Sequence, residues 1–296
     1  MKILVSGSRG LVGSALVPFL TAQGHQVVRL RRGGAVVDQG AARWDPATGA
    51  IDESACADAD AVVHLAGENL AAGRWTAERK RRILSSRADV TKRLCETLAR
   101  MTQPPHVLVS ASAVGYYGSR GDELLDESSN GGSGFLADVC RAWEEATRPA
   151  SAAGIRTVNL RLGMVLSGRG GALARMLLPF RIGLGGAMGS GRQYVSWIAI
   201  DDLVSIIHHV IAAEELSGPV NAVAPEPLTN REFARTLARV LRRPAVVTIP
   251  AFALRLLFGE MAGGVLLSST RVVPERLLNS GYIFQHRDLE SALAGC

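Results

Sequence analysis

Three glycines near the N-terminus recur at every third position. Gly7, Gly10 and Gly13 follow a short apolar run, residues 2–6, and precede apolar residues at helical spacing. A backbone without Cβ atoms can turn tightly and lets a pyrophosphate approach the positively polarised start of a helix. We therefore predict a dinucleotide site in this GxxGxxG turn. The alternative is a tight strand–helix turn without a ligand.

Arginines gather where the second strand is expected to end. Arg29, Arg31 and Arg32 lie there, and no acidic residue precedes Asp38. An acid at this place binds the ribose 2′-hydroxyl of NAD, whereas guanidinium groups suit the 2′-phosphate of NADP. We predict NADP(H), with Arg9 in the glycine turn as a further contact. The alternative is a solvated basic strand end, since the chain has 30 arginines and only three lysines.

Expected strands and helices alternate through the first half of the chain. Short apolar runs predict strands, and the segments between them carry apolar residues at helical spacing. The expected strands are 2–6, 25–32, 60–67, 106–112 and 155–163, with a helix after the first and longer helices at 76–101 and 134–153. This alternation predicts an α/β fold with a Rossmann-type, doubly wound parallel sheet.

The pattern changes after Gly163. The glycine-rich residues 166–194 indicate loops around a site, and residues 195–215 indicate a strand leading into a helix. We expect a dinucleotide-binding domain of residues 1–165, to which residues 195–215 return. A smaller, mainly helical substrate lobe is expected from residues 166–194 and 216–296.

The composition excludes several classes of protein. The net charge is +6, but 33 basic residues are interleaved with 27 acidic ones, so we expect no nucleic-acid partner. Four distant cysteines and histidines without ligand spacing predict neither disulfides nor a metal site, and His64 is expected to pack at its strand end. The N-terminal apolar run is too short for a signal peptide or a membrane span, so we expect a soluble cytoplasmic protein.

Longer motifs resemble the extended short-chain dehydrogenase/reductase superfamily, which contains sugar-nucleotide epimerases and dehydratases. They are GSRGLVG, HLAGE, VLVSASAVGYYG, LRLGMVLSG and YVSWIAIDDLV. GENLAAGRW, SRADVTKRLCETL, FLADVCRAWEE and the PERLLNSGYIF tail are similar to an atypical bacterial "epimerase family" subgroup with a C-terminal domain of unassigned function. Together with the arginines above, the resemblance implies cofactor contacts from Gly7, Ser8, Arg9, Gly10, Leu11, Val12, Gly13, Arg31, Arg32, Leu65, Ala66, Gly67, Ser110, Ala111 and Arg161.

The resemblance also shows what is missing. Active members carry a Tyr-x-x-x-Lys pair, in which the lysine lowers the pKa of the phenol so that it exchanges a proton while hydride moves to or from the nicotinamide. This chain has no such pair, because all its lysines precede residue 93 and none follows a tyrosine by four. The match places Leu136 and Cys140 at these positions and Arg87 at that of a helix asparagine. Only the serine, Ser112, remains.

Each catalytic candidate has two interpretations. Ser112 either faces the nicotinamide or satisfies backbone groups at a strand end. Cys140 is either a catalytic thiol, whose pKa a neighbouring arginine or an oxidised nicotinamide lowers toward neutrality, or a small core residue. Arg87 either holds an anionic or carbonyl substrate or is a surface charge.

Substrate contacts are expected from Tyr116, Tyr117 and Arg192. Without a neighbouring lysine the pKa of both phenols stays near 10, so the tyrosines are expected to shape the pocket floor. Arg192 lies in a glycine-rich loop and either clamps a substrate phosphate or caps that loop.

Two functions of different classes follow. One is an NADP(H)-dependent enzyme that epimerises or reduces a nucleotide-sugar or a related small metabolite. The other is a catalytically silent NADP(H) sensor or scaffold, and the cell-division-inhibitor label of related proteins implies a partner for it. Residues 76–101 and 134–153 resemble the helix pair of family dimers, but Arg141, Glu144 and Glu145 place charge on the second helix, so an equilibrium between monomer and homodimer is expected.

Overall fold

Seven parallel strands form the central sheet of the computed structural model, which describes residues 1–33, 40–245 and 247–295. Their order is β12-β7-β5-β4-β1-β2-β3, and every neighbouring pair is parallel. The chain starts in the middle, winds outward through β2 and β3, and continues from β4 on the other side of β1. The winding direction therefore reverses between β1 and β4, which is where α/β sheets bind ligands.

The central strands β1 and β4 are almost continuous buried runs, as expected when both faces of a parallel sheet are covered. All four residues of β4 are buried, and so are four of the five residues of β1. The bounds are β1 Lys2–Ser6, β2 Gln26–Arg31, β3 Ala41–Arg43, β4 Ala61–His64, β5 Val107–Ala113, β7 Arg156–Leu162 and β12 Gly218–Ala222. Asp38 and Cys296 lie outside the described residues.

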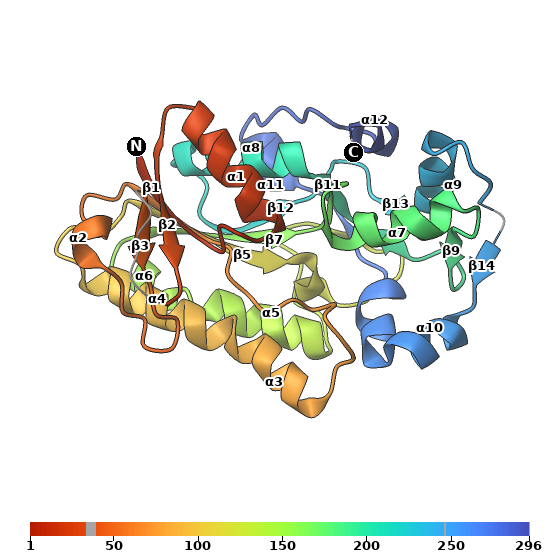
Figure 1. The fold of residues 1–296 in the computed structure, drawn as a ribbon, viewed down its shortest axis with the longest axis horizontal. Helices are drawn as coiled ribbons and strands as arrows, with labels where there is room; N and C mark the ends of the chain where they lie inside the picture. Colours follow the sequence, from red (N-terminus) through yellow and green to blue (C-terminus); the bar gives the residue numbers. More distant parts are fainter. Residues whose placement is uncertain (34–39, 246, 296) are drawn as a thin grey trace.

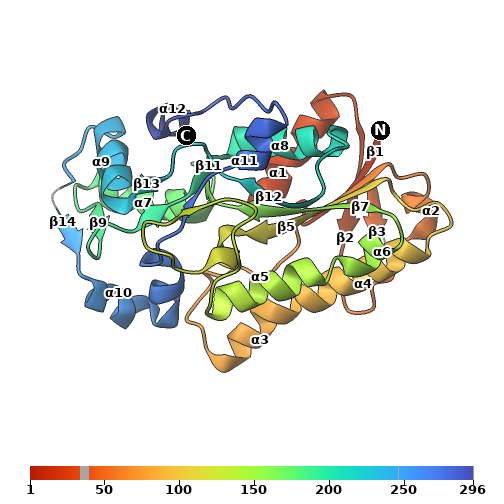
Figure 2. The same cartoon turned by 180° about the vertical axis from the view of Figure 1, so that it is seen from behind.

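Helices cover both faces of the sheet, so the doubly wound α/β prediction is confirmed (Figures 1 and 2). One layer holds α1 (Leu11–Ala22), α8 (Ile200–Ala212) and α11 (Glu275–Asn279). The other holds α3 (Ala77–Ser85), α4 (Ala88–Arg100), α5 (Phe135–Glu145) and α6 (Arg148–Ala152). The short α2 (Glu53–Cys56) and the 3-10 helix η1 (Val114–Tyr117) lie in loops between strands.

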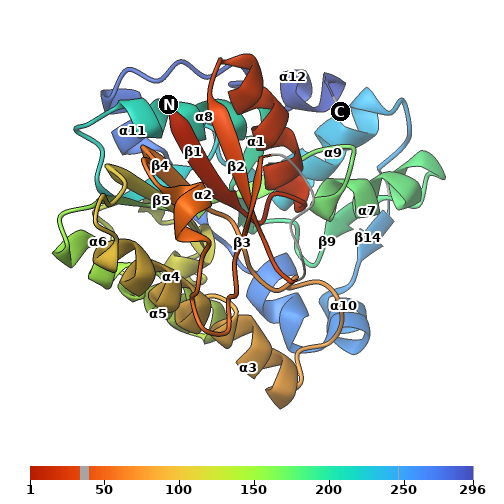
Figure 3. The ribbon, with the colours of Figure 1, turned by 60° about the vertical axis from the view of Figure 1, so that its left-hand side comes forward.

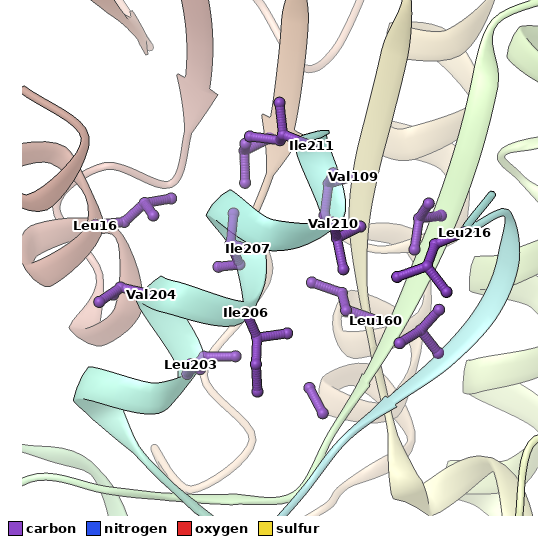
Figure 4. Packing of buried hydrophobic residues seen from close by; sticks show 14 of the residues in the cluster. Leu16, Val109, Leu160, Leu203, Val204, Ile206, Ile207, Val210, Ile211 and Leu216 are labelled. Atoms are coloured by element: carbon purple, nitrogen blue, oxygen red, sulfur yellow. The ribbon is translucent and has the colours of Figure 1, made fainter. Parts of the chain in front are cut away.

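The largest core cluster lies under α8. Leu203, Ile206, Ile207 and Val210 recur with helical periodicity and are all fully buried. They pack toward Leu16 of α1 and toward strands β5 and β7 (Figure 4). Residues 200–212 therefore share the core of the sheet, although residues 166–194 separate them from it in sequence.

A smaller lobe lies beyond the carboxyl ends of the strands, on the right of Figure 1. Its core includes Phe180, Phe233, Leu237 and Leu293. It holds α7 (Gly171–Arg181), α9 (Asn230–Val240), α10 (Ala251–Phe258), the π-helix η2 (Ala262–Leu266), α12 (Leu289–Ala294) and the pair β9 (Gly186–Met188) with β14 (Val247–Ile249). Three further pairs are β10 (Tyr194–Val195) with β13 (Leu228–Thr229), β8 (Met164–Leu166) with β11 (Trp197–Ala199), and β6 (Leu124–Leu125) with β15 (Arg271–Val272).

Three boundaries differ from the sequence prediction. The lobe was expected to resume at residue 216, but β12 pairs with β7 as the edge of the main sheet, a choice that local periodicity does not record. The expected helix 76–101 breaks before α4 at Arg87, whose side chain turns inward. The expected helix 134–153 also breaks, and Pro149, which lacks an N–H group, lies in the first turn of α6.

The helices of the described residues give no candidate for a bilayer-spanning segment, because none is both long and apolar enough. The cytoplasmic location stays a prediction.

His64 ends β4 with its ring fully buried. Its Nδ1 lies 2.7 Å from Ser6 Oγ, its Nε2 lies 3.0 Å from Thr91 Oγ1, and Trp44 packs edge-on against it. Burial lowers the pKa of His64 to about 4, so the ring is neutral at physiological pH. His64 is thus a packing residue at the end of its strand, as the sequence indicates.

We expect acid to destabilise the protein partly through His64. The unfolded chain binds a proton there near pH 6.5 and the folded protein only near pH 4, so the stabilisation is complete above pH 6.5 and is lost as pH falls toward 4. The loss reaches about 3 kcal/mol. His64→Gln should flatten the pH dependence of the free energy of unfolding, measured by urea titration between these limits. An identical slope in both proteins would contradict this assignment.

Candidate functional site

The glycine turn lies at the reversal point, between the carboxyl ends of β1 and β4. Gly7 has φ +67°, and a Cβ atom there would lie 2.7 Å from the backbone carbonyl carbon of Leu65. A Cβ atom on Gly13 would lie 2.3 Å from the carbonyl oxygen of Gly7, whereas one on Gly10 would meet only that oxygen, at 3.2 Å. Gly7 and Gly13 are therefore required by the packing of the turn, and Gly10 leaves the space in front of α1 open.

Helix α1 begins without a capping side chain. Gly10 is its N-cap, and no acidic residue occupies its first turn. The first N–H groups of a helix have no intrahelical acceptor, so those of Leu11, Val12 and Gly13 suit an anion held at this end. The turn thus combines close backbone approach with partial positive charge.

A cleft of about 980 Å³ opens at this edge of the sheet. It lies between the glycine turn, the end of β2 and the end of β4. Nine of the predicted cofactor residues line it: Gly7, Ser8, Arg9, Gly10, Arg31, Arg32, Leu65, Ala66 and Gly67. Ser110 and Ala111 are instead buried within β5.

A smaller cavity of about 260 Å³ adjoins the cleft and shares part of its wall. Arg9 from the turn and Arg29 and Arg31 from β2 all line it. Cationic side chains from two elements therefore border one space, beside Arg32 in the main cleft. This arrangement suits a phosphate group.

Arg161 lies in a buried ion pair. Its Nε and Nη2 each donate to one carboxylate oxygen of Glu144 at 2.8 Å, and only 3% of its side chain is exposed. Ser112 Oγ donates to Glu144 Oε1 at 2.7 Å. Neither Arg161 nor Ser112 is among the residues that line the cleft. The carboxylate of Glu144 thus orients both groups at the ends of β5 and β7.

The two tyrosines of η1 pack around this ion pair. The Arg161 guanidinium lies 3.5 Å from the centroid of the Tyr116 ring, and its Nη1 donates to Tyr117 Oη at 2.9 Å. Tyr117 is fully buried, and its hydroxyl donates to Asn221 Oδ1. Burial raises the pKa of Tyr117 to about 12, so the expected value near 10 is wrong for this residue. Tyr117 is buried beside the Arg161–Glu144 pair and Tyr116 is half-buried against Arg161, and neither tyrosine lines the cleft.

Arg87 is buried beside the wall of the cleft. Its Nη2 donates to the Glu68 carbonyl at 3.0 Å, its Nη1 donates to the Ile83 carbonyl at 3.2 Å, and its guanidinium stacks on the Trp143 ring. A Cβ atom on Gly67 would lie 3.3 Å from Arg87 Cζ. The interpretation of Arg87 as a surface charge is therefore wrong.

Cys140 is buried between α5 and η1. Desolvation raises the pKa of its thiol to about 12, because the nearby charges of Arg87 and Arg161 do not offset burial. The expectation that an arginine lowers this pKa toward neutrality is therefore wrong. The thiol is protonated at neutral pH.

Arg192 is exposed, and its backbone N–H donates to Ser190 Oγ within the loop. It does not line the cleft. Within the part of the chain that the structure describes, no group of His, Cys, Asp and Glu side chains is arranged to hold a metal ion.

Sequence reasoning missed Glu144, which it treated as a charge on a dimer helix. Leu136, Cys140 and Glu144 are spaced by four along α5 and so share one helical face. Only 13% of the Glu144 side chain is exposed. This spacing could have identified Glu144 from the sequence, because Glu144 lies one helical turn beyond Cys140 on the face that carries the two family positions, Leu136 and Cys140.

Residues 3–223 match the NAD dependent epimerase/dehydratase family. The chain belongs to this family. Residues 249–296 match a domain of unknown function. The resemblance inferred from the motifs is therefore confirmed, including its C-terminal unit.

Two relatives and one further solved structure match almost the whole of this chain. Epimerase family protein Mb2239 of Mycobacterium bovis is 43% identical over 291 residues, which cover 98% of this chain and 96% of that protein. A crystal structure of human epimerase family protein SDR39U1 with NADPH has a TM-score of 0.91 and 37% identity, and covers 100% of this chain and 98% of that one. The nucleoside-diphosphate sugar epimerase from Corynebacterium glutamicum has a TM-score of 0.82 and 39% identity, covering 99% of this chain and 57% of that one.

The buried ion pair makes a prediction about stability. Glu144→Ala leaves the Arg161 guanidinium buried without a counter-charge, so the free energy of unfolding should fall by about 3–5 kcal/mol. The neighbouring Glu145 pairs with Arg148 at the surface, and Glu145→Ala should cost less than about 1 kcal/mol. Urea unfolding of both variants measures the difference. Equally small losses would show that the Glu144 pair does not hold α5 to the sheet.

Proposed function

We propose that this chain binds NADP(H) in the cleft and acts on a nucleotide-sugar or a related small metabolite as an atypical epimerase or reductase. The observation that carries the proposal is the glycine turn, which sets the open N-terminus of α1 beside an arginine-lined cavity. The turn fits a pyrophosphate, because Gly7 and Gly13 allow the close backbone packing that forms it and Gly10 leaves the space in front of α1 open. The NADPH in the human relative's crystal structure supports the choice of cofactor.

Different residues of the chain would hold different parts of the cofactor. The backbone of residues 7–13 would hold the pyrophosphate, and Arg9, Arg31 and Arg32 would hold the 2′-phosphate. Leu65–Gly67 would form the wall beside the sugar and the nicotinamide. A bound nicotinamide dinucleotide supplies hydride-transfer chemistry.

Ser112, Arg87 and Cys140 are the proposed catalytic residues. Because the Ser112 hydroxyl donates a hydrogen bond to Glu144, its oxygen lone pairs can accept a hydrogen bond from a substrate hydroxyl. The buried charge of Arg87 would stabilise negative charge that develops on a substrate oxygen. The protonated Cys140 thiol can act only as a weak donor.

Tyr116 and Arg192 are the proposed substrate contacts, and buried Tyr117 holds the neighbouring Arg161 in place. The name of the Corynebacterium glutamicum relative, a nucleoside-diphosphate sugar epimerase, supports a nucleotide-sugar as substrate.

The homodimer stays a prediction. The outer faces of α4 and α5 carry ion pairs within the chain, such as Lys92–Glu96 and Arg141–Asp138.

A silent NADP(H) sensor or scaffold is the second candidate. The observation that favours it is the loss of the acid–base pair on α5, where Leu136 packs in an apolar cluster and the Cys140 thiol does not ionise near neutral pH. A partner in cell division would fit this candidate.

The experiment that separates the two candidates starts from the purified protein. Mass spectrometry identifies any co-purified nucleotide, and a panel of sugar nucleotides and carbonyl compounds tests turnover. Turnover of a panel member supports the enzyme. Tight NADP(H) binding without any turnover supports the sensor, and failure to bind NADP(H) overturns both.

The arginines predict a preference between cofactors. NADPH should bind more tightly than NADH, and Arg31→Ala with Arg32→Ala should remove most of that difference. Each charge-assisted contact to phosphate contributes about 1.5–3 kcal/mol. Titration of the two cofactors into both proteins, followed by nucleotide fluorescence, measures it. Equal affinities in the native protein would defeat the prediction.

Ser112 and Cys140 predict different losses of turnover once a substrate is found. Ser112→Ala should lower kcat by roughly 100-fold, the loss typical of removing one preorganised polar contact to the transition state, and should leave NADPH affinity nearly unchanged. Cys140→Ala should lower it less, because its thiol is protonated at neutral pH. Steady-state kinetics and NADPH titration of each variant provide the test. Full activity in both variants would rule out the proposed chemistry.

A further inference from the structure

One segment joins the cofactor cleft to the C-terminal unit. Residues 68–76, here called the strap, follow β4 and lead into α3, passing beside α10 (Figure 3). At one end Glu68 lines the cleft, and at the other Thr76 caps α3 with its side chain. The strap includes residues 68–75 of the GENLAAGRW motif, and the proposed function assigns these residues no role.

The cleft end of the strap is held by polar contacts. The Glu68 N–H donates to Ser86 Oγ at 3.1 Å, and the Glu68 carbonyl accepts from Arg87 at 3.0 Å. Arg79 pairs with the Glu68 carboxylate at 3.4 Å and donates to the Asn69 carbonyl. These contacts join the wall of the cleft to α3 and α4.

The far end of the strap is tied to α10. The Arg74 guanidinium donates to the carbonyl oxygens of Leu256 and Leu257, in the last turn of the helix. These carbonyls have no partner within an α-helix, and a cation suits a helix C-terminus. Just beyond the strap, Lys80 pairs with Glu260 at 2.9 Å.

Trp75 is the apolar part of the same junction. It is 7% exposed and packs in a cluster with Ile83, Val139 and Met261. Its ring packs edge-on against Phe135, at 5.2 Å between centroids. A Cβ atom on Gly264 in η2 would lie 3.1 Å from that ring, so the absence of a side chain lets η2 close on Trp75.

We propose that the C-terminal unit, residues 249–296, sets the affinity of the cleft for NADP(H) by holding the strap, with Arg74 and Trp75 as positioning residues. The inference rests on the proposed function of the cleft. A strap released from α10 and η2 would leave Gly67 and Glu68 less ordered, and binding would then have to order them. By linkage, NADP(H) binding and docking of the C-terminal unit strengthen each other by the same factor.

Two adjacent glycines provide a matched test. A Cβ atom at position 264 would meet the Trp75 ring, whereas one at position 263 would meet nothing within 4 Å, so Gly264→Leu is compared with Gly263→Leu. In NADPH titrations Gly264→Leu should bind roughly 10-fold more weakly than wild type, within the usual range of coupling between sites. Gly263→Leu should stay within about twofold, since it leaves the contact intact. Trp75→Ala should repeat the loss, and Trp75→Phe should restore part of the affinity.

Hydrogen exchange on the wild-type protein tests the reciprocal effect and needs no variant to fold. NADPH should slow exchange of the backbone amides of residues 251–266, which lie outside the cleft. Unchanged exchange there, or equal NADPH affinity in the two folded glycine variants, would overturn the inference and leave the proposed function standing. A wild-type protein that does not bind NADPH would overturn the proposed function and this inference together.

Discussion

The structure depends on the absence of two side chains at the reversal point of the sheet. Without a Cβ atom at Gly7, the backbone that follows β4 can close against the turn, and without one at Gly13, α1 can start directly over the end of β1. A methyl group at either position would clash with neighbouring backbone atoms. The close approach sets how near the backbone that follows β4 lies to the turn and where the helix N-terminus is placed, and so defines the cleft in which a pyrophosphate would lie.

Around the family's catalytic positions, the buried arginines and Glu144 are charged, whereas the cysteine, tyrosine and histidine do not titrate near neutral pH. Cys140 and Tyr117 both have a pKa raised to about 12 by burial, and the pKa of His64 is lowered to about 4. Arg87 and the pair of Arg161 with Glu144 supply fixed, oriented charges. Chemistry at this site would therefore depend on preorganised electrostatics and on the Ser112 hydroxyl, rather than on a side chain that gains or loses a proton as it works.

The two lobes are interleaved in sequence and joined at several places. The chain leaves the sheet after β7, returns for α8, completes the sheet edge with β12 and then ends in the helical lobe. The strap is a further connection, because it carries the wall of the cleft directly to α10 and η2. Through the strap, a C-terminal unit that does not line the cleft would influence the affinity of the cleft for its ligand.

The sequence by itself determined the alternating α/β order, the glycine turn and the basic end of β2, because periodicity and turn chemistry act over a few neighbouring residues. The absence of the Tyr-x-x-x-Lys pair could also be read from the sequence, since it depends only on residue identity. Only the tertiary structure decided that Glu144 faces Arg161 and Ser112 rather than solvent, that Arg87 turns inward, and that β12 joins the main sheet. Those outcomes, and the raised pKa of Cys140, depend on which elements pack together and how much water they exclude, and local sequence does not record either.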